Sequence, residues 1–165
     1  MILISESIQN QVWDILREVP DPEIPVLSVI DLGIIRSVDY GNNGLIVTIT
    51  PTYSGCPAMG TFEEDIKNKL KENGFSNVEV ETVYKPAWTT DWISEEGLLK
   101  LKEYGIAPPE KTLSGKAELL RNKSIACPRC DSKDARLVSE FGSTACKALY
   151  QCNECQEPFD YFKCI

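Results

Sequence analysis

Near its C-terminus the chain reads Cys127-Pro128-Arg129-Cys130 and, after twenty-one further residues, Cys152-Asn153-Glu154-Cys155. Two thiolates three positions apart on a tight turn can point at one centre, and a second pair completes a tetrahedral S₄ site. Zn²⁺ favours this ligand set in structural sites, and four protein ligands leave no position open for catalysis. The pattern therefore predicts a zinc ribbon with these four cysteines as metal ligands. Iron on the same four thiolates is the alternative.

The sequence around the two pairs predicts strands near 136–141, 147–151 and 159–163, so the ribbon is expected to span 123–165. Two further cysteines, Cys146 and Cys164, lie outside the four-ligand set. The last strand returns antiparallel, so we expect them to be cross-strand neighbours at the end of the ribbon away from the metal. They are either an accessory dithiol or two small buried residues, and the second interpretation is favoured.

The region before the ribbon has the signals of a small α+β domain. Helical spacing of apolar residues, β-branched runs and turn residues predict the order α-β-β-α-β, with a further short helix after the last strand. The expected elements are helices at 5–19, 58–72 and 94–104 and strands at 34–38, 45–50 and 78–83. We therefore expect a small sheet with helices on one side in residues 1–104, and a Pro-containing polar linker at 105–122.

Composition narrows the chemistry further. The chain has seven cysteines, no secretory signal and no apolar run near the roughly 20 residues of a membrane span, so a reducing cytoplasm and no membrane are expected. It has no histidine, which excludes Ser-His-Asp and Cys-His catalysis, His-ligated zinc and the facial triad of non-haem iron oxygenases.

The net charge of −8 is unevenly distributed. Residues 123–165 hold six basic and six acidic side chains, whereas the first 122 residues hold eleven basic and nineteen acidic ones. A neutral ribbon on an acidic body offers no electrostatic footprint for phosphate. Nucleic-acid binding is therefore disfavoured.

The first candidate site outside the ribbon is acidic. It reads Asp21-Pro22-Glu23-Ile24-Pro25, followed by Asp31-Leu32-Gly33, and its prolines force an extended, rigid loop. The carboxylates of Asp21, Glu23 and Asp31 could bind a cation, activate a thiol or take basic partners. Composition alone favours plain turn chemistry, because Asp, Pro and Gly are common in turns.

The second candidate is the loop Thr50-Pro51-Thr52-Tyr53-Ser54-Gly55-Cys56-Pro57-Ala58. Cys56 precedes a predicted helix, whose positive dipole end and free N–H groups are expected to lower the pKa of its thiol. Thr52, Tyr53 and Ser54 could add hydrogen bonds to the sulfur. A small buried cysteine that fills a gap at a helix start is the alternative.

Two tryptophans, Trp88 and Trp92, lie in an irregular segment after the third predicted strand. Exposed, they would be anchors for a partner protein. Packed over the sheet, they would belong to the core. We expect a core role for one of them and leave the other open.

Together, the acidic loop and the Cys56 loop resemble the small α+β domain of iron–sulfur cluster assembly factors of the SufT type. More specific stretches are Gly105-Ile106-Ala107-Pro108-Pro109, Phe141-Gly142-Ser143-Thr144-Ala145-Cys146-Lys147 and Glu157-Pro158-Phe159-Asp160-Tyr161-Phe162-Lys163-Cys164. With Trp88 and Asp91-Trp92-Ile93-Ser94, they make nearly the whole chain similar to the PaaD (or PaaJ) family, accessory subunits encoded with the bacterial phenylacetyl-CoA epoxidase.

This resemblance implies a role in phenylacetate degradation, where the epoxidase makes the ring-1,2-epoxide of phenylacetyl-CoA. The oxygenase of that system carries a di-iron site, and its reductase carries flavin and a plant-type [2Fe–2S] cluster. A chain without histidine or a nucleotide-binding glycine motif fits neither component. The resemblance therefore implies a non-catalytic maturation role, with the reductase, other oxygenase subunits and the iron–sulfur assembly machinery as partners. In this interpretation Cys56 is a transient iron or cluster ligand, and Asp21, Glu23 and Asp31 shape its loop.

Two other classes of function stay open. A structural adaptor would hold the oxygenase complex together through its tryptophans and would tolerate loss of Cys56. A hydrolase or thiol transferase would use Cys56 as a nucleophile and would need a general base. Only a carboxylate or Lys85 is available for that task, so this class is disfavoured.

Overall fold

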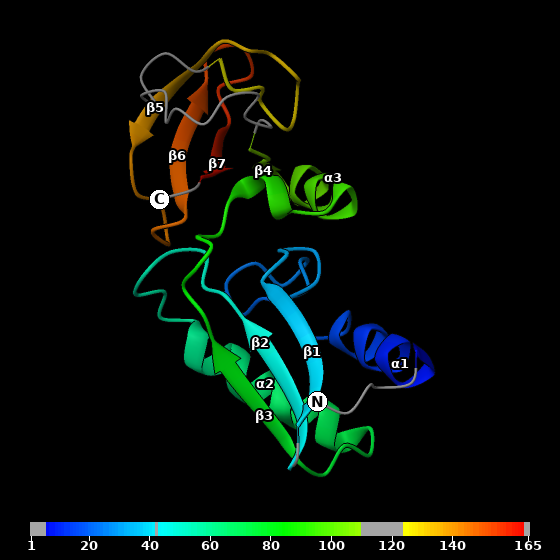
Figure 1. Cartoon of the computed structure of the whole chain (residues 1–165). Helices are drawn as coiled ribbons and strands as arrows, with labels where there is room; N and C mark the ends of the chain where they lie inside the picture. Colours follow the sequence, from blue (N-terminus) through cyan, green and yellow to red (C-terminus); the bar gives the residue numbers. More distant parts are fainter. Residues whose placement is uncertain (1–5, 42, 110–123, 164–165) are drawn as a thin grey trace. The chain divides into compact units, whose positions relative to one another are not determined.

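The computed structural model describes residues 6–41, 43–109 and 124–163 of the 165-residue chain. The chain forms two compact units, which meet in sequence between Ser94 and Glu95. Each unit has its own β-sheet (Figure 1). The α+β class predicted from the sequence is confirmed.

The first unit contains α1 (Glu6–Leu16), β1 (Ile35–Gly41), β2 (Gly44–Ile49), α2 (Met59–Glu72) and β3 (Val78–Thr82), followed by the 3₁₀ helix η1 (Thr90–Trp92). This is the predicted order α-β-β-α-β. The sheet has the strand order β1-β2-β3. β1 and β2 form the expected antiparallel hairpin, whereas β3 runs parallel to β2 because α2 carries the chain back along the sheet (Figure 1).

The core of this unit follows from the two periodicities of its sequence. Residues three or four apart on each helix are buried, and so are alternate residues of β2. The buried side chains are Val12, Ile15 and Leu16 on α1, Phe62, Ile66 and Leu70 on α2, and Leu45, Val47 and Ile49 on β2. α2 contacts both α1 and β3. The sheet therefore has one core-facing side.

Helix α2 ends as its sequence predicts. Gly74 adopts φ +95°, and the N–H of Phe75 donates to the carbonyl of Leu70 at 3.1 Å. A residue in the left-handed region with such a bond satisfies carbonyls that the last helical turn leaves open, and glycine adopts it without strain. The chain can then turn directly into β3.

The second unit contains α3 (Glu95–Tyr104), β4 (Ile106–Ala107), β5 (Ala135–Ser139), β6 (Lys147–Cys152) and β7 (Pro158–Phe162). The three predicted ribbon strands are confirmed as the antiparallel set β5, β6 and β7. The full strand order is β4-β7-β6-β5, with β4 parallel to β7.

The organisation of the chain differs in one respect from the sequence prediction. The second compact unit begins at Glu95, so it includes α3, which the sequence assigns to the first domain. Residues 106–107, the start of the predicted linker, form β4 and pair with Asp160 and Tyr161 of β7. Residues 110–122 of that linker lie outside the described part of the chain.

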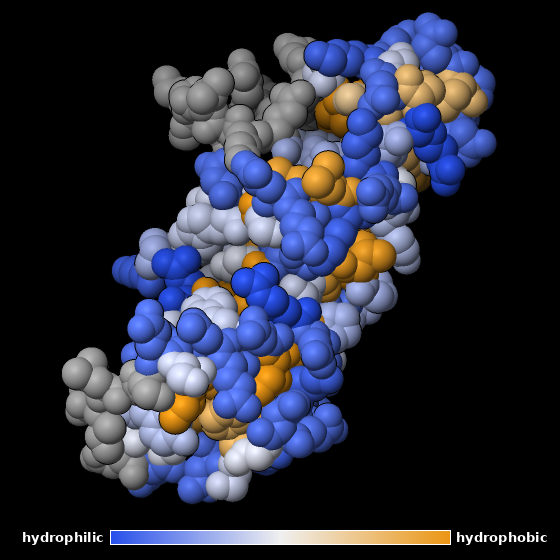
Figure 2. Space-filling model, turned by 90° about the vertical axis from the view of Figure 1, so that its right-hand side faces the viewer, coloured by the Kyte–Doolittle hydropathy of each residue, from blue (hydrophilic) through white to orange (hydrophobic). Residues whose placement is uncertain are grey.

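The ribbon has a small hydrophobic core of its own. Its buried members include Ile125, Ala148, Tyr150, Phe159 and Tyr161, together with two of the cysteines. Within residues 6–41, 43–109 and 124–163, no helix combines the length and hydrophobicity needed to cross a bilayer. Figure 2 shows a face on which hydrophilic side chains predominate around smaller hydrophobic patches.

Candidate functional site

The four cysteines of the two C-x-x-C pairs converge in the ribbon. The sulfur atoms of Cys127, Cys130, Cys152 and Cys155 all lie within 4.8 Å of one another. The Sγ atoms of Cys127 and Cys155 are 3.8 Å apart, and those of Cys130 and Cys152 are 3.6 Å apart. A tetrahedron with Zn–S bonds of about 2.3 Å requires sulfur separations of about 3.8 Å. The donor set and its spacing therefore fit a tetrahedral thiolate-bound metal.

The two knuckles share one backbone pattern. The N–H of Cys127 donates to the carbonyl of Ser132 at 2.8 Å, and the N–H of Cys152 donates to the carbonyl of Glu157 at 3.0 Å. Directly after each second cysteine the backbone turns left-handed, at Asp131 (φ 59°) and Gln156 (φ 63°). This conformation is uncommon outside glycine, so both turns are held by their surroundings.

Hydrogen bonds within the knuckles set the acidity of the thiols. Backbone N–H groups of Cys155 and Glu154 lower the pKa of Cys152 to about 7. For Cys130 the N–H of Ser132 also acts to lower the pKa, but desolvation and the neighbouring sulfurs raise it to about 12. The direction of the pKa shift therefore differs between sulfurs of one cluster.

Cys56 lies half-buried in the loop between β2 and α2. Its N–H donates to the carbonyl of Tyr53 at 3.2 Å, and its carbonyl accepts from the N–H of Met59 at 3.3 Å. α2 begins at Met59 with Ala58 as its N-cap, so both Cys56 and Pro57 precede the helix. The predicted placement of Cys56 just ahead of a helix is thereby observed.

The predicted acidity of Cys56 is wrong. Burial raises the pKa of its thiol above the ordinary value, and the negative charge of Glu23 raises it further. Hydrogen bonds from the N–H of Ala58 and from the side chains of Thr52 and Tyr53 act in the opposite direction without reversing the result. The helix start alone does not predict this pKa, because burial of the thiol and, to a lesser extent, the charge of Glu23 outweigh it.

Asp21 builds the loop that carries Glu23. Its Oδ1 atom accepts hydrogen bonds from the N–H of Glu23 at 2.6 Å and from the N–H of Ile24 at 2.9 Å. The Asp21 N–H donates to the carbonyl of Leu27 at 2.7 Å, and the residue is buried. This is the turn chemistry that the sequence favours for this motif, and it fixes the backbone of Glu23.

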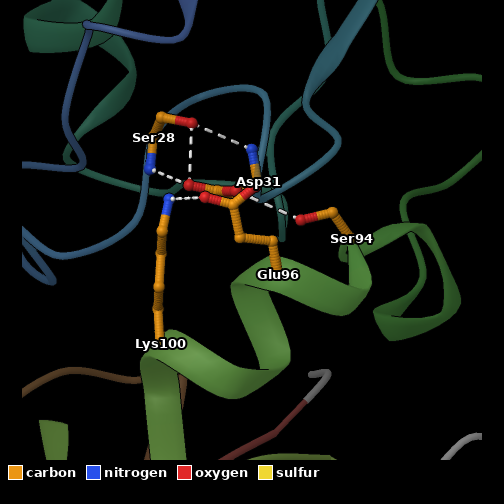
Figure 3. A network of polar contacts seen from close by, with 5 residues as sticks. All are labelled: Ser28, Asp31, Ser94, Glu96 and Lys100. Atoms are coloured by element: carbon orange, nitrogen blue, oxygen red, sulfur yellow. Dashed lines mark hydrogen bonds and ion pairs between the residues drawn. The ribbon is translucent and has the colours of Figure 1, made fainter. Parts of the chain in front are cut away.

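Asp31 is buried within a separate network (Figure 3). Its Oδ2 atom accepts from the N–H and the hydroxyl of Ser28, each at 2.9 Å, and its Oδ1 atom accepts from the Ser94 hydroxyl at 3.1 Å. The Ser94 N–H also donates to the Asp31 carbonyl at 2.9 Å. Asp31 therefore ties its loop to residue 94. The Lys100–Glu96 contact in the same figure is an i,i+4 ion pair within α3.

The two tryptophans pack onto the loop that follows Asp31. Trp88 is buried, and its indole N–H donates to the carbonyl of Leu32 at 2.8 Å, so it belongs to the core. Trp92 is half-buried beneath the guanidinium of Arg36, which lies 3.9 Å from the ring centroid. A Cβ atom on Gly33, whose φ is +66°, would come within 2.3 Å of the Trp92 carbonyl oxygen. This close approach explains the glycine.

The predicted pairing of Cys146 with Cys164 lies outside the described residues, because Cys164 does not belong to them. Cys146 is buried, and its sulfur lies 3.1 Å from the hydroxyl oxygen of Thr144. Sequence reasoning missed two other residues, Ser28 and Ser94, which hold Asp31. Ser28 lies three positions from Asp31, within the range of a local turn, whereas Ser94 is 63 positions away from Asp31 and no local signal marks it.

Comparison with known protein families divides the chain in the same two regions. A model described as iron–sulfur cluster assembly protein matches residues 9–82, and a model described as PaaD zinc beta ribbon domain matches residues 111–163. The four-cysteine cluster and the ribbon match together support metal binding.

Two proteins and one solved domain are similar to this chain. A protein of Escherichia coli (strain K12) described as a subunit of 1,2-phenylacetyl-CoA epoxidase is 49% identical over 94% of this chain and 93% of its own length. An Fe-S protein maturation auxiliary factor of Porphyromonas gingivalis (strain ATCC BAA-308 / W83) is 43% identical over 56% of this chain and 90% of its own. The crystal structure of a DUF59 domain from Bacillus anthracis has a TM-score of 0.54 and 30% identity, covering 58% of this chain and 92% of that one.

Proposed function

This chain belongs to the PaaD family of phenylacetyl-CoA epoxidase subunits, and we propose that it assists iron–sulfur cluster assembly or insertion for that enzyme system. The relative described as an Fe-S protein maturation auxiliary factor and the assembly-type domain at residues 9–82 support this role. In this proposal the protein is an accessory factor without a reaction of its own, and it works in the cytoplasm.

The observation that carries the proposal is the half-buried thiol of Cys56, whose pKa is raised by burial and further by the negative charge of Glu23. The Cys56 loop and the Asp21-anchored turn bring a half-buried thiol under the influence of a carboxylate whose backbone is fixed. A thiolate next to a carboxylate is costly without a cation, because two negative charges repel each other. A positively charged iron species would stabilise the thiolate and the carboxylate together.

The chemistry is ligand exchange. When Cys56 binds iron, its S–H bond breaks, an S–Fe bond forms, the proton passes to water and no electron moves. Because burial and Glu23 hold the pKa of the thiol above its ordinary value, deprotonation is coupled to the arrival of the cation. The hydrogen bonds from Thr52, Tyr53 and Ala58 then stabilise the bound thiolate. A ligand of this kind can release its cargo once the thiol is protonated again.

We assign the ribbon cysteines Cys127, Cys130, Cys152 and Cys155 to one structural Zn²⁺. The ion, when bound, would cross-link the two knuckles and leave no coordination position for a substrate. Backbone N–H groups of the knuckle turns already donate to the sulfurs of Cys130, Cys152 and Cys155. The ribbon is therefore a folded module that accompanies the Cys56 domain, not a second cargo site.

The client that we propose is the reductase of the epoxidase system, with its [2Fe–2S] cluster. A sharp test uses purified apo-reductase, ferrous iron and sulfide under anaerobic conditions. Cluster formation is followed by visible absorbance and by electron paramagnetic resonance after reduction. We expect the wild-type chain to speed cluster formation, and Cys56→Ser to abolish that effect.

A matched control is Cys146→Ser, which removes a thiol outside both the Cys56 loop and the four-cysteine cluster. It should act like the wild type. Equal acceleration by Cys56→Ser and wild type would refute the assignment of Cys56. If the chain binds the reductase tightly and changes no rate, it is an adaptor protein instead.

A further inference from the structure

One side of the β1-β2-β3 sheet faces away from the hydrophobic core. Registered positions on its three strands place Ser37 beside Thr48 and Glu81, and Asp39 beside Ile46 and Glu79. These six residues are called the outer face below. All are half-buried or exposed, whereas the alternate residues of β2 point into the core. Figure 1 shows β2 and β3 with α2 behind them.

β3 is also an open strand edge. Among the described residues it pairs with β2 alone. The Leu45 N–H donates to the Asn77 carbonyl, and the Val83 N–H donates to the Ile49 carbonyl. Along a strand, successive N–H groups point alternately to the two sides. The two bonds above therefore place the N–H groups of Glu79 and Glu81 towards β2, and those of Val80 and Thr82 towards the open edge. An outward row of this kind is a template for a further strand.

The charge of the outer face selects what can bind there. Asp39, Glu79 and Glu81 are exposed, and the face has no basic side chain. A second copy of β3 would set glutamates against glutamates, which is unfavourable directly across a strand pair. The same repulsion works against nucleic acid. A strand with lysine or arginine at alternate positions would gain two or more opposite-charge pairs.

A hollow of about 810 Å³ opens at the end of the sheet where β2 and β3 begin. It is lined by Ile46 and Glu79 of the outer face and by Gly41, Asn77 and Lys71, among others. The outer face thus runs into a recess with room for side chains that extend beyond an added strand.

We propose that the outer face and the β3 edge dock a basic, extended segment of a partner protein, which adds to the sheet as a fourth strand. Backbone hydrogen bonds to Val80 and Thr82 would fix the register of the added strand against β3. Glu79 and Glu81 would select basic side chains on that strand. The docking is independent of Cys56, because it uses neither the thiol nor its loop.

The test uses the full-length, zinc-loaded chain and a seven-residue peptide of alternating valine and lysine. Amide hydrogen exchange is measured by NMR with and without the peptide. Saturating peptide should slow exchange at the outward N–H groups of Val80 and Thr82 by about tenfold or more. The N–H groups of Glu79 and Glu81, already bonded to β2, should change little. A peptide of alternating valine and glutamate should give no protection.

Charge reversal separates this site from general attraction to an acidic protein. The double variant Glu79→Lys/Glu81→Lys should weaken peptide binding by about tenfold, as expected for two lost and two newly repulsive cross-strand pairs. Its matched control, Glu64→Lys/Glu72→Lys, makes the same charge change at exposed positions of α2. The control should retain protection at Val80 and Thr82. Equal losses in both variants, or no protection in the wild type, would overturn the proposal.

Discussion

The acidity of Cys56 gives the most direct prediction at the scale of single residues. Glu23→Gln removes a charge that raises the pKa of the Cys56 thiol, so the pKa should fall and the thiolate fraction near neutral pH should rise. The rate of alkylation by iodoacetamide, measured at Cys56 by mass spectrometry between pH 6 and 9, should therefore increase in the variant. In both proteins the rate should climb with pH, because only the thiolate reacts.

The control for this measurement is Glu64→Gln, which removes an exposed carboxylate from α2. It should leave the reactivity of Cys56 unchanged. A rate at Cys56 that is unchanged or lower in Glu23→Gln would contradict the electrostatic effect of Glu23 on the thiol.

Asp31 is expected to matter for stability. Asp31→Ala leaves the buried N–H of Ser28 without its partner and removes the bond to Ser94, so the first unit should lose about 2–4 kcal/mol. Ser94→Ala loses one half-buried hydroxyl and should cost about 1 kcal/mol. Urea unfolding followed by tryptophan fluorescence reports on this unit alone, because all three tryptophans lie before residue 95. A cost for Asp31→Ala no greater than that of Ser94→Ala would disprove the network.

Sequence reasoning at this scale succeeded where the cause was local. Asp21 serves its own turn, as the loop composition indicates. It failed for the Cys56 pKa because burial of the thiol raises that pKa most, and Glu23, from a loop 33 positions earlier, raises it further; the local sequence shows neither effect. The roles of Asp21, Glu23 and Asp31 towards iron stay predictions.

The left-handed turn after the second zinc knuckle is expected to affect zinc retention. Gln156 follows the second knuckle with φ 63°, a conformation that a β-branched side chain strongly disfavours. Gln156→Val should cost about 1–2 kcal/mol and weaken zinc retention by about tenfold. Gln156→Asn tolerates this backbone and should be nearly neutral. Competition with a chromophoric chelator measures both variants. Equal zinc affinities for Val and Asn would show that the left-handed turn does not limit the knuckle.

Most helices and strands could be predicted because each shows the spacing of apolar residues typical of its type and is followed by turn residues. Gly74 after α2 and Gly105 after α3 are examples. The two-residue strand β4 could not, since Ile106 and Ala107 become a strand only by pairing with β7, more than fifty residues later. The unusual backbone at Asp131 and Gln156 also has no sequence signal of its own. It follows from the convergence of four sulfurs.

At the scale of the whole molecule, the chain joins two units with different electrostatic character. Residues 1–94 contain fourteen acidic and six basic side chains, whereas residues 95–165 contain eleven of each. The entire net charge of −8 therefore belongs to the unit that carries Cys56. This unit repels polyanions and favours cationic cargo and basic protein surfaces, which agrees with the proposed maturation role.

Complementation of a strain that lacks this gene shows whether Cys56 is needed to fill the reductase cluster in the cell. Wild type, Cys56→Ser and the control Cys146→Ser are expressed at equal levels, and [2Fe–2S] occupancy of the purified reductase is read together with epoxidase activity. We predict that Cys56→Ser leaves the reductase present but largely without its cluster, whereas Cys146→Ser restores occupancy and activity. Normal occupancy and activity with Cys56→Ser would refute the maturation role of Cys56 and make it a packing residue.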